Sequence, residues 1–201
     1  MWKDTDVLLV IDVQNDFCPG GRLAVPGGNE VVPLINRLAK SFRHVVLTQD
    51  WHPAEHKSFA SRHPGKSAFE TTMMPYGPQT LWPDHCIQDT PGAALHADLH
   101  IPHAELILRK GFREEIDSYS AFFENDHKTP TGLGGYLRER GFEKVVCVGL
   151  AFDFCVRFSA EDARMLGFDT EVIEAACRAI DLQGSADQAR KSFADRGIVL
   201  A

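Results

Sequence analysis

The chain has 201 residues with a formal net charge of −7, and 44% of its residues are apolar while 24% are charged. This composition is typical of a globular domain with a sizeable core, and the absence of a basic surplus argues against a nucleic-acid-binding protein. The apolar runs are too short to span a bilayer, which argues against an integral membrane protein.

The N-terminus and the cysteines indicate a compartment. The opening sequence MWKDTDVLLVIDVQ places charges directly before a strand-like run and lacks the apolar core and cleavage site of a signal peptide. The five cysteines are odd in number, widely spaced and free of any C-x-x-C pair, as is typical of thiols in a reducing compartment. We therefore expect a cytoplasmic protein with one domain over residues 1–201 and with neither nucleic acid nor membrane as a partner.

The chain alternates between apolar, β-branched-rich runs and segments with a helical spacing of apolar residues. The first five runs are almost continuously apolar, as in strands of a parallel sheet that is covered on both faces. This order predicts a doubly wound α/β fold with helices on both faces of the sheet. In chain order the expected elements are the strand Val7–Val13, the helix Glu30–Phe42, the strands His44–Thr48 and Glu105–Leu108, the helix Thr131–Arg140, the strand Val145–Gly149, the helix Cys155–Leu166, the strand Thr170–Ile173, the helix Ser185–Asp195 and the strand Ile198–Leu200.

Two long stretches interrupt this alternation. Residues 50–104 and 111–130 are rich in proline, histidine, glycine and aromatic residues and contain no further predicted element. Loops of this length in a compact domain are usually functional. A flat, ring-shaped ligand would need aromatic walls, and the aromatic residues available for them are Phe17, Trp51, Phe69, Trp82, Tyr119 and Phe122.

Chemically active side chains follow four of the predicted strands. Asp12 follows the first strand, Asp50 and His52 follow the second, Lys110 follows the third, and Cys155 lies in the loop after the fourth. In open α/β sheets, ligands bind beyond the carboxyl ends of the strands. The sequence therefore predicts that an acid, an acid with a histidine, a lysine and a thiol meet at one edge of the sheet.

Cys155 is a candidate nucleophile because it stands where a strand has ended and a helix begins. The N-terminus of that helix and a nearby Lys110 would both favour the thiolate. Asp12 would then accept the thiol proton, which gives an Asp/Lys/Cys triad rather than a Cys/His pair. The alternatives are a buried structural cysteine and a carboxylate that only caps the strand or pairs with Lys110.

Asp50, His52 and His85 form a candidate metal site. Asp50 and His52 alternate along an extended segment, so both side chains can point the same way, and His85 can join them from the long loop. One carboxylate and two imidazoles suit one divalent ion, zinc before iron or manganese. His56 and Ser58 are further neighbours, and the alternative is that these histidines are surface residues.

Five motifs together resemble the nicotinamidase/pyrazinamidase family of the isochorismatase-like cysteine hydrolases. They occur in order from the first predicted strand to the last third of the chain. The motifs are LLVIDVQNDFCPGG, TQDWHPAEHKSFAS, LWPDHCIQDTPGAALH, RKGFREEIDSYSAF and VCVGLAFDFCV. The resemblance implies a three-layer α/β/α fold with a six-stranded, mostly parallel sheet and helices on both faces.

The resemblance also implies roles for individual residues. It assigns the triad to Asp12, Lys110 and Cys155, and one divalent metal ion to Asp50, His52 and His85. It implies an oxyanion hole formed by the backbone N–H groups of Ala151 and Cys155, with a cis peptide bond between Leu150 and Ala151. Phe17, Trp82 and Tyr119 match positions that wall the substrate ring.

The activity implied by the resemblance is metal-dependent hydrolysis of a linear amide. Nicotinamide would give nicotinate and ammonia through a Cys155 thioester, in NAD salvage, and pyrazinamide would give pyrazinoate. The nearest alternative is another amidohydrolase of the superfamily that acts on a ureido or carbamoyl substrate. A non-haem iron oxygenase using Asp50, His52 and His85, and a non-catalytic binding protein, are further alternatives, and a homo-oligomer is left open.

Overall fold

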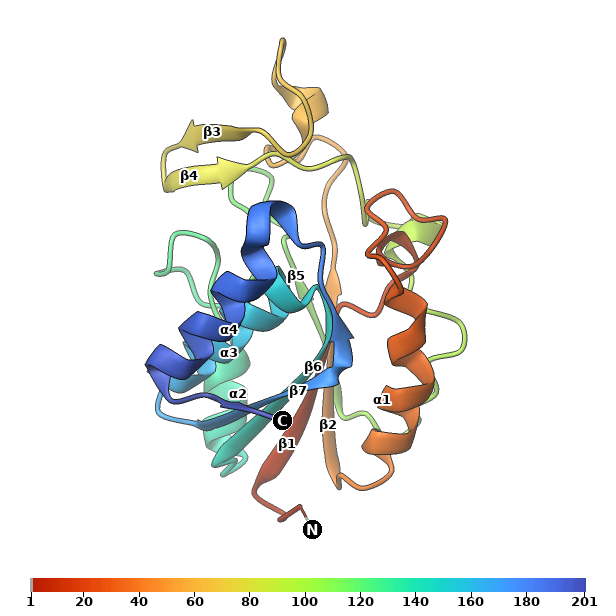
Figure 1. Cartoon of the computed structure of the whole chain (residues 1–201), viewed down its shortest axis with the longest axis vertical. Helices are drawn as coiled ribbons and strands as arrows, with labels where there is room; N and C mark the ends of the chain where they lie inside the picture. Colours follow the sequence, from red (N-terminus) through yellow and green to blue (C-terminus); the bar gives the residue numbers. More distant parts are fainter. Residues whose placement is uncertain (1) are drawn as a thin grey trace.

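The computed structural model describes residues 2–201 and contains a six-stranded parallel sheet (Figure 1). The strands lie in the order β5-β2-β1-β6-β7-β8, so the chain moves outward in one direction from β1 and then in the other from β6. This order is that of a doubly wound fold with its switch point between β1 and β6. The strands are β1 Asp6–Ile11, β2 His44–Asp50, β5 Leu106–Lys110, β6 Lys144–Leu150, β7 Asp169–Arg178 and β8 Val199–Leu200.

Helices cover both faces of this sheet. Helix α1 (Val31–Ala39) lies on one face, and α2 (Leu133–Glu139), α3 (Arg157–Met165) and α4 (Ser185–Arg196) lie on the other (Figure 1). The expected three-layer α/β/α architecture is therefore confirmed. Within residues 2–201, we find no helix that combines the length and the apolar character needed to cross a membrane.

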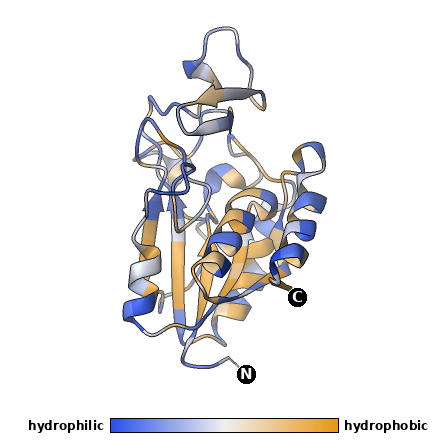
Figure 2. Ribbon diagram, turned by 90° about the vertical axis from the view of Figure 1, so that its left-hand side faces the viewer, coloured by the Kyte–Doolittle hydropathy of each residue, from blue (hydrophilic) through white to orange (hydrophobic). Residues whose placement is uncertain are grey.

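The continuous apolar runs of the central strands contribute to two hydrophobic cores, one on each face of the sheet. Along β1, Val7, Leu9 and Ile11 pack toward α2–α4, whereas Leu8 and Val10 pack toward α1. Successive side chains of a strand point to opposite faces, so a strand with a core on each side must be apolar at every position. Figure 2 shows the result, with hydrophobic strands enclosed by helices that turn their hydrophilic sides outward.

The structure adds a small hairpin that the sequence reasoning missed. Strands β3 (Thr71–Met74) and β4 (Gly77–Thr80) pair antiparallel to each other, apart from the main sheet, within the stretch predicted as a loop. The hairpin projects beyond the carboxyl ends of the parallel strands (Figure 1). It therefore lies on the side of the molecule where the predicted site residues gather.

Two boundaries near the site also differ from expectation. Asp50 and Lys110 are the last residues of β2 and β5 rather than residues that follow those strands. Cys155 precedes α3 and lies in a single π-helical turn, Phe152–Val156, instead of opening an α-helix. Such turns are rare in proteins, and those that occur are often found at functional sites.

Gly149 allows β6 to approach β1 closely at the switch point. Its φ is +119°, and a Cβ atom there would lie 2.1 Å from the carbonyl oxygen of Ile11. A larger residue would push the two strands apart directly before Asp12 and before the turn that carries Cys155. The glycine thus sets the separation of these two strand ends.

Candidate active site

Lys110 lies at the centre of the predicted constellation and is completely buried. Its Nζ atom is 2.7 Å from Asp12 Oδ2 and 2.5 Å from Asp50 Oδ1, and it donates to the Ser118 carbonyl oxygen at 2.9 Å. The Cys155 sulfur lies 3.5 Å from the same nitrogen. The structure therefore brings together the strand-end residues that the sequence predicts to meet.

The charge of Lys110 is held by its two carboxylates. Burial alone would lower the pKa of the ammonium group, but Asp12 and Asp50 outweigh it and raise that pKa well above its ordinary value. Burial would likewise raise the pKa of Asp50, whereas Lys110 and His52 lower it below its ordinary value. Lys110 is thus a fixed cation and Asp50 a fixed anion at neutral pH.

Asp12 behaves differently from Asp50. Burial raises its pKa to about 6, and the attraction of Lys110 offsets this only in part. Its backbone is held in the left-handed region with φ of 49°, and its Oδ1 accepts a hydrogen bond of 2.6 Å from the Thr48 hydroxyl. A carboxyl group with this pKa can accept a proton and release it near neutral pH, as general acid–base catalysis requires.

Cys155 is a buried thiol, although the sequence predicts that the following helix and Lys110 favour the thiolate. Burial raises its pKa well above the ordinary value, and the nearby Lys110 offsets this only in part. The expectation that the helix N-terminus and Lys110 favour the thiolate underestimated the cost of burying a charge. The thiol therefore needs a proton acceptor, and ligand atoms of Asp12, Asp50 and Cys155 lie within 4.8 Å of one another.

The turn between β6 and α3 also carries the residues predicted for the oxyanion hole. Ala151 is buried and lines the same cleft as Cys155, and its peptide bond with Leu150 is cis. The Ala151 carbonyl oxygen accepts hydrogen bonds of 3.1 Å from the N–H groups of Phe154 and Val156. This pairing directs the carbonyl into the turn.

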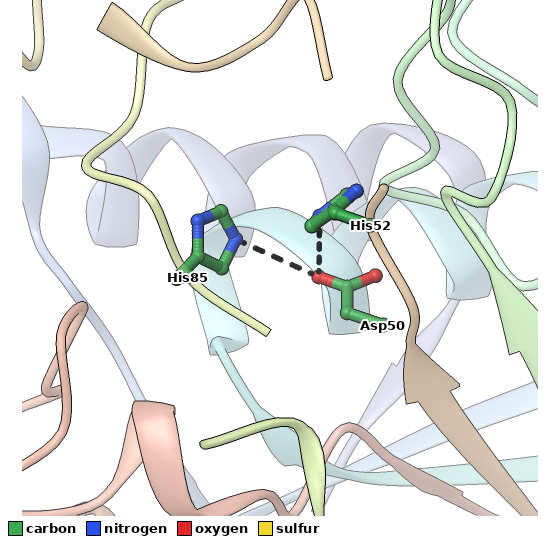
Figure 3. A group of neighbouring side chains, drawn as sticks. All are labelled: Asp50, His52 and His85. Atoms are coloured by element: carbon green, nitrogen blue, oxygen red, sulfur yellow. Dashed lines mark ion pairs between the residues drawn. The ribbon is translucent and has the colours of Figure 1, made fainter. Parts of the chain in front are cut away.

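Asp50, His52 and His85 form a buried three-residue set whose ligand atoms lie within 4.8 Å of one another. Both Nε2 atoms face the same carboxylate oxygen, Asp50 Oδ2, at 3.6 Å for His52 and 3.9 Å for His85 (Figure 3). Ligands of a tetrahedral zinc ion with bonds of about 2 Å lie about 3.3 Å apart, so the set is close to that geometry.

The remaining nitrogens of these two rings support the same interpretation. His52 Nδ1 lies 2.8 Å from the Gly111 carbonyl oxygen, and His85 Nδ1 lies 2.8 Å from that of Pro83. A metal-binding histidine typically donates its other N–H group in this way. Burial lowers the pKa of His85 to about 4, so that it presents a neutral imidazole, whereas burial at His52 is outweighed by the Asp50 carboxylate, which raises the pKa of that ring. The donor set therefore fits a divalent metal ion.

A second set, His52, His56 and Asp117, has the same spacing but a different character. His56 Nδ1 lies 2.7 Å from the Ser58 hydroxyl oxygen, and His56 Nε2 lies 3.3 Å from the Ile116 carbonyl oxygen. Both ring nitrogens are therefore engaged within the protein. This arrangement favours His56 and Ser58 as neighbours of the metal set rather than as members of it.

The predicted aromatic walls fall into two groups. Phe17, Trp82 and Tyr119 line one cleft, whereas Trp51 stacks under the Arg109 guanidinium group at 3.6 Å and Phe122 lies in the core. The Phe69 ring meets Trp82 edge to face with 6.0 Å between ring centroids and is not part of the cleft lining. The complete lining of the cleft is Phe17, Leu23, Asp50, Trp82, His85, Asp117, Tyr119, Ala151, Phe154, Cys155 and Ile180.

Sequence reasoning missed three of these lining residues. Phe154 is not one of them, because its place beside Cys155 in the motif AFDFC already suggests an effect on the pocket, and its ring contacts Trp82 edge to face at 4.9 Å between centroids. Leu23, Asp117 and Ile180 carry no comparable signal, because each lies in an irregular segment that only the folded chain brings to the cleft.

Comparison with known proteins supports the class indicated by the fold and the site. The isochorismatase domain family matches residues 6–201. A nicotinamidase from Acinetobacter baylyi is 53% identical over 191 residues, which cover 95% of this chain and 89% of that protein. The chain is thus an isochorismatase-like α/β protein by sequence as well as by sheet order.

Solved structures narrow the class further. A nicotinamidase/pyrazinamidase from Acinetobacter baumanii superimposes with a TM-score of 0.98 at 56% identity, covering 100% of this chain and 97% of that one. A pyrazinamidase of Pyrococcus horikoshii in complex with zinc superimposes with a TM-score of 0.79 at 32% identity, covering 98% of both chains. The chain belongs to the nicotinamidase/pyrazinamidase family.

Proposed function

We propose that the chain hydrolyses nicotinamide to nicotinate and ammonia, and pyrazinamide to pyrazinoate, in a metal-dependent reaction of NAD salvage. One observation carries the proposal. Lys110 contacts Asp12 and Cys155, the acid and the thiol of the proposed triad. It also contacts Asp50, the carboxylate of the proposed metal set, so the triad and the metal set lie at one cleft. The names of the related nicotinamidases indicate the substrate, which is a small heteroaromatic amide.

The first half of the reaction uses Asp12 and Cys155. As the sulfur attacks the amide carbon, the thiol proton passes to the Asp12 carboxylate, whose raised pKa suits this transfer. Lys110 stays protonated and stabilises the negative charge that moves between sulfur and carboxylate. The backbone N–H groups of Ala151 and Cys155 are assigned to the developing oxyanion.

The second half restores the thiol. Protonated Asp12 gives its proton to the leaving ammonia, and a thioester with Cys155 remains. Water then attacks the thioester carbon while Asp12 accepts one of its protons. The carbon–sulfur bond breaks, the sulfur takes this proton back from Asp12 to restore the thiol, and the released acid loses its carboxyl proton to solvent as nicotinate. Because the cleft is lined by Phe17, Trp82 and Tyr119, a flat ring fits between apolar walls while the amide faces the sulfur.

Asp50, His52 and His85 are assigned to one divalent ion, zinc before iron or manganese, since a related pyrazinamidase is in complex with zinc. When bound, such an ion acts as a Lewis acid that can take the ring nitrogen of the substrate as a ligand. Lys110 keeps Asp50 ionised, and the Gly111 and Pro83 carbonyl groups hold the two imidazoles in orientation. A cytoplasmic location and one domain over residues 1–201 are predictions of the sequence, which leaves a homo-oligomer open.

The decisive experiment compares nicotinamide with benzamide under identical conditions. Benzamide has the ring and the amide but no ring nitrogen, so we expect its kcat/KM to be lower by about a hundredfold. The Cys155→Ala variant, with folding checked by circular dichroism, serves as the control and should release no ammonia. Equal kcat/KM values would reduce the assignment to a general amidohydrolase, and activity restricted to ureido or carbamoyl compounds would favour the alternative within the superfamily.

A further inference from the structure

Gln79 is the one buried residue of the segment 71–80, which forms the exposed hairpin β3–β4. Its side chain is only 2% exposed, whereas Met73 on the paired strand is 76% exposed. A neutral amide costs free energy when it is buried unless its hydrogen bonds are made. The position of this amide therefore depends on what it contacts.

The Gln79 amide nitrogen points toward the wall of the cleft. It donates to the Tyr119 hydroxyl oxygen and to Asp117 Oδ2, each at 2.8 Å, and the Thr80 carbonyl oxygen lies at the same distance. Asp117 and Tyr119 both line the cleft described above. The hairpin thus contacts two residues of the substrate cleft through the Gln79 side chain.

The orientation of the amide is fixed by the charge on one side of it. Asp117 is buried, and across residues 2–201 no ion pair reaches its carboxylate, which accepts the Ser118 N–H and the Gln79 amide. A flipped amide would bring its carbonyl oxygen against this anion. The Gln79 oxygen instead accepts from Asn125 Nδ2 at 3.0 Å and from the Tyr76 hydroxyl at 3.3 Å.

Tyr119 connects Gln79 to Trp82 through hydrogen bonds to its hydroxyl oxygen. The Tyr119 hydroxyl oxygen accepts a second hydrogen bond, 3.1 Å long, from Trp82 Nε1, and the two rings lie edge to face at 6.1 Å. The backbone N–H of Tyr119 donates to Asn125 Oδ1 at 2.9 Å, so the residue is held at both ends. Two of the three aromatic walls of the cleft therefore have their polar ends fixed by one network.

We propose that Gln79 is a positioning residue for substrate binding: it acts through the Tyr119 hydroxyl to hold Tyr119 and Trp82 in the orientation that admits a flat ring. This inference rests on the proposed function, which places the ring of the amide between these walls. A preformed wall contacts ground state and transition state alike, so its loss raises KM and leaves kcat nearly unchanged.

The experiment is a double-mutant cycle on nicotinamide hydrolysis with Gln79→Met and Tyr119→Phe. Methionine keeps the length of the side chain but has no amide, so Gln79→Met should raise KM about tenfold, equivalent to one hydrogen bond, with kcat within about threefold. In the Tyr119→Phe background the same change should alter KM by less than about twofold, because the hydroxyl partner is already gone. Thr72→Val, on the strand position that faces Gln79 in the hairpin, is the matched control and should change neither constant.

The outcomes separate this inference from the proposed function. If the unsubstituted chain does not hydrolyse nicotinamide, the proposed function fails, and Gln79 is then judged by the affinity of the same variants for nicotinate. If the unsubstituted chain is active, a tenfold effect of Gln79→Met in both backgrounds, or a loss in kcat instead of KM, overturns the inference. Failure of both Gln79→Met and Gln79→Ala to fold would also overturn it, since Gln79 would then be a structural residue.

Discussion

Lys110 is the residue on which both parts of the candidate site depend. It is buried without any exposed surface, and its ammonium group lies between Asp12 and Asp50. The Lys110 ammonium group is therefore paired with two carboxylates that have different proposed roles. It keeps Asp50, a proposed metal ligand, ionised, whereas it leaves Asp12 with a pKa of about 6, where a proton can be exchanged.

The pKa of Asp12 gives a pH dependence with a defined sign. Asp12 must be unprotonated to accept the thiol proton, so kcat/KM should be constant above about pH 6 and fall about tenfold per pH unit below it. A pH–rate profile for nicotinamide, with folding monitored at each pH, measures this. An activity that stays constant down to pH 4.5 would remove Asp12 as the base, as would an Asp12→Asn variant that loses less than about a hundredfold in kcat.

Gly111 makes room for the His52 ring, and its replacement should weaken metal binding. A Cβ atom at Gly111 would lie 2.5 Å from His52 Cε1, and the Gly111 carbonyl oxygen orients the same ring. We expect Gly111→Ala to lower zinc affinity by about 10- to 100-fold, measured by competition with a chelator. Gly65→Ala is the control, because Gly65 has a similar positive φ with open space around it. Equal affinities in the two variants would contradict the prediction.

At the scale of elements, the central parallel strands could be predicted because they have an apolar core on both sides. The hairpin β3–β4 could not, since TTMMPYGPQT shows no alternation of apolar and polar residues. The π-helical turn at Cys155 escaped prediction because apolar spacing does not distinguish it from the helix that follows. The strand-end residues were correctly brought together, whereas the pKa of Cys155 required the depth of burial, which a sequence does not contain.

The turn that carries Cys155 is tied to the start of α4 by Asp153, and this contact should be essential for stability. The buried Asp153 carboxylate accepts from the Ile180 N–H at 3.0 Å, the Asp181 N–H at 2.7 Å and the Ser185 hydroxyl at 2.5 Å. In Asp153→Asn, the amide N–H₂ group would face donors, which should cost about 2 kcal/mol of unfolding free energy. Urea denaturation measures the loss, and an unchanged midpoint with an unchanged slope would contradict it.

At the scale of the whole molecule, the sheet order places the site. The switch point between β1 and β6 leaves a gap beyond the strand ends, and the long connection between β2 and β5 supplies both His85 and the hairpin above it. The two helical layers pack on the sheet, whereas the proposed site residues lie at strand ends, in the turn Phe152–Val156 and in the long loops.

Metal binding should stabilise the whole chain, because β2 and the loop with His85 come together only in the folded state. Zinc at a hundred times its Kd should add about 2.7 kcal/mol to the free energy of unfolding, which is seen as a rise in Tm. The His85→Ala variant should show little or no rise at the same zinc concentration. A wild-type Tm that does not respond to zinc, or an equal rise in both proteins, would contradict the assigned ligand set.

The position of β1 in the middle of the sheet also bears on how the chain acquires activity during synthesis. In β1, Val7 lies opposite His44 of β2 on one side and opposite Val145 of β6 on the other. The second contact closes a far longer loop and is slower to form. On a nascent chain the proposed metal ligands Asp50, His52 and His85 therefore emerge before Cys155, and we expect hydrolysis only once β1 has paired with β6.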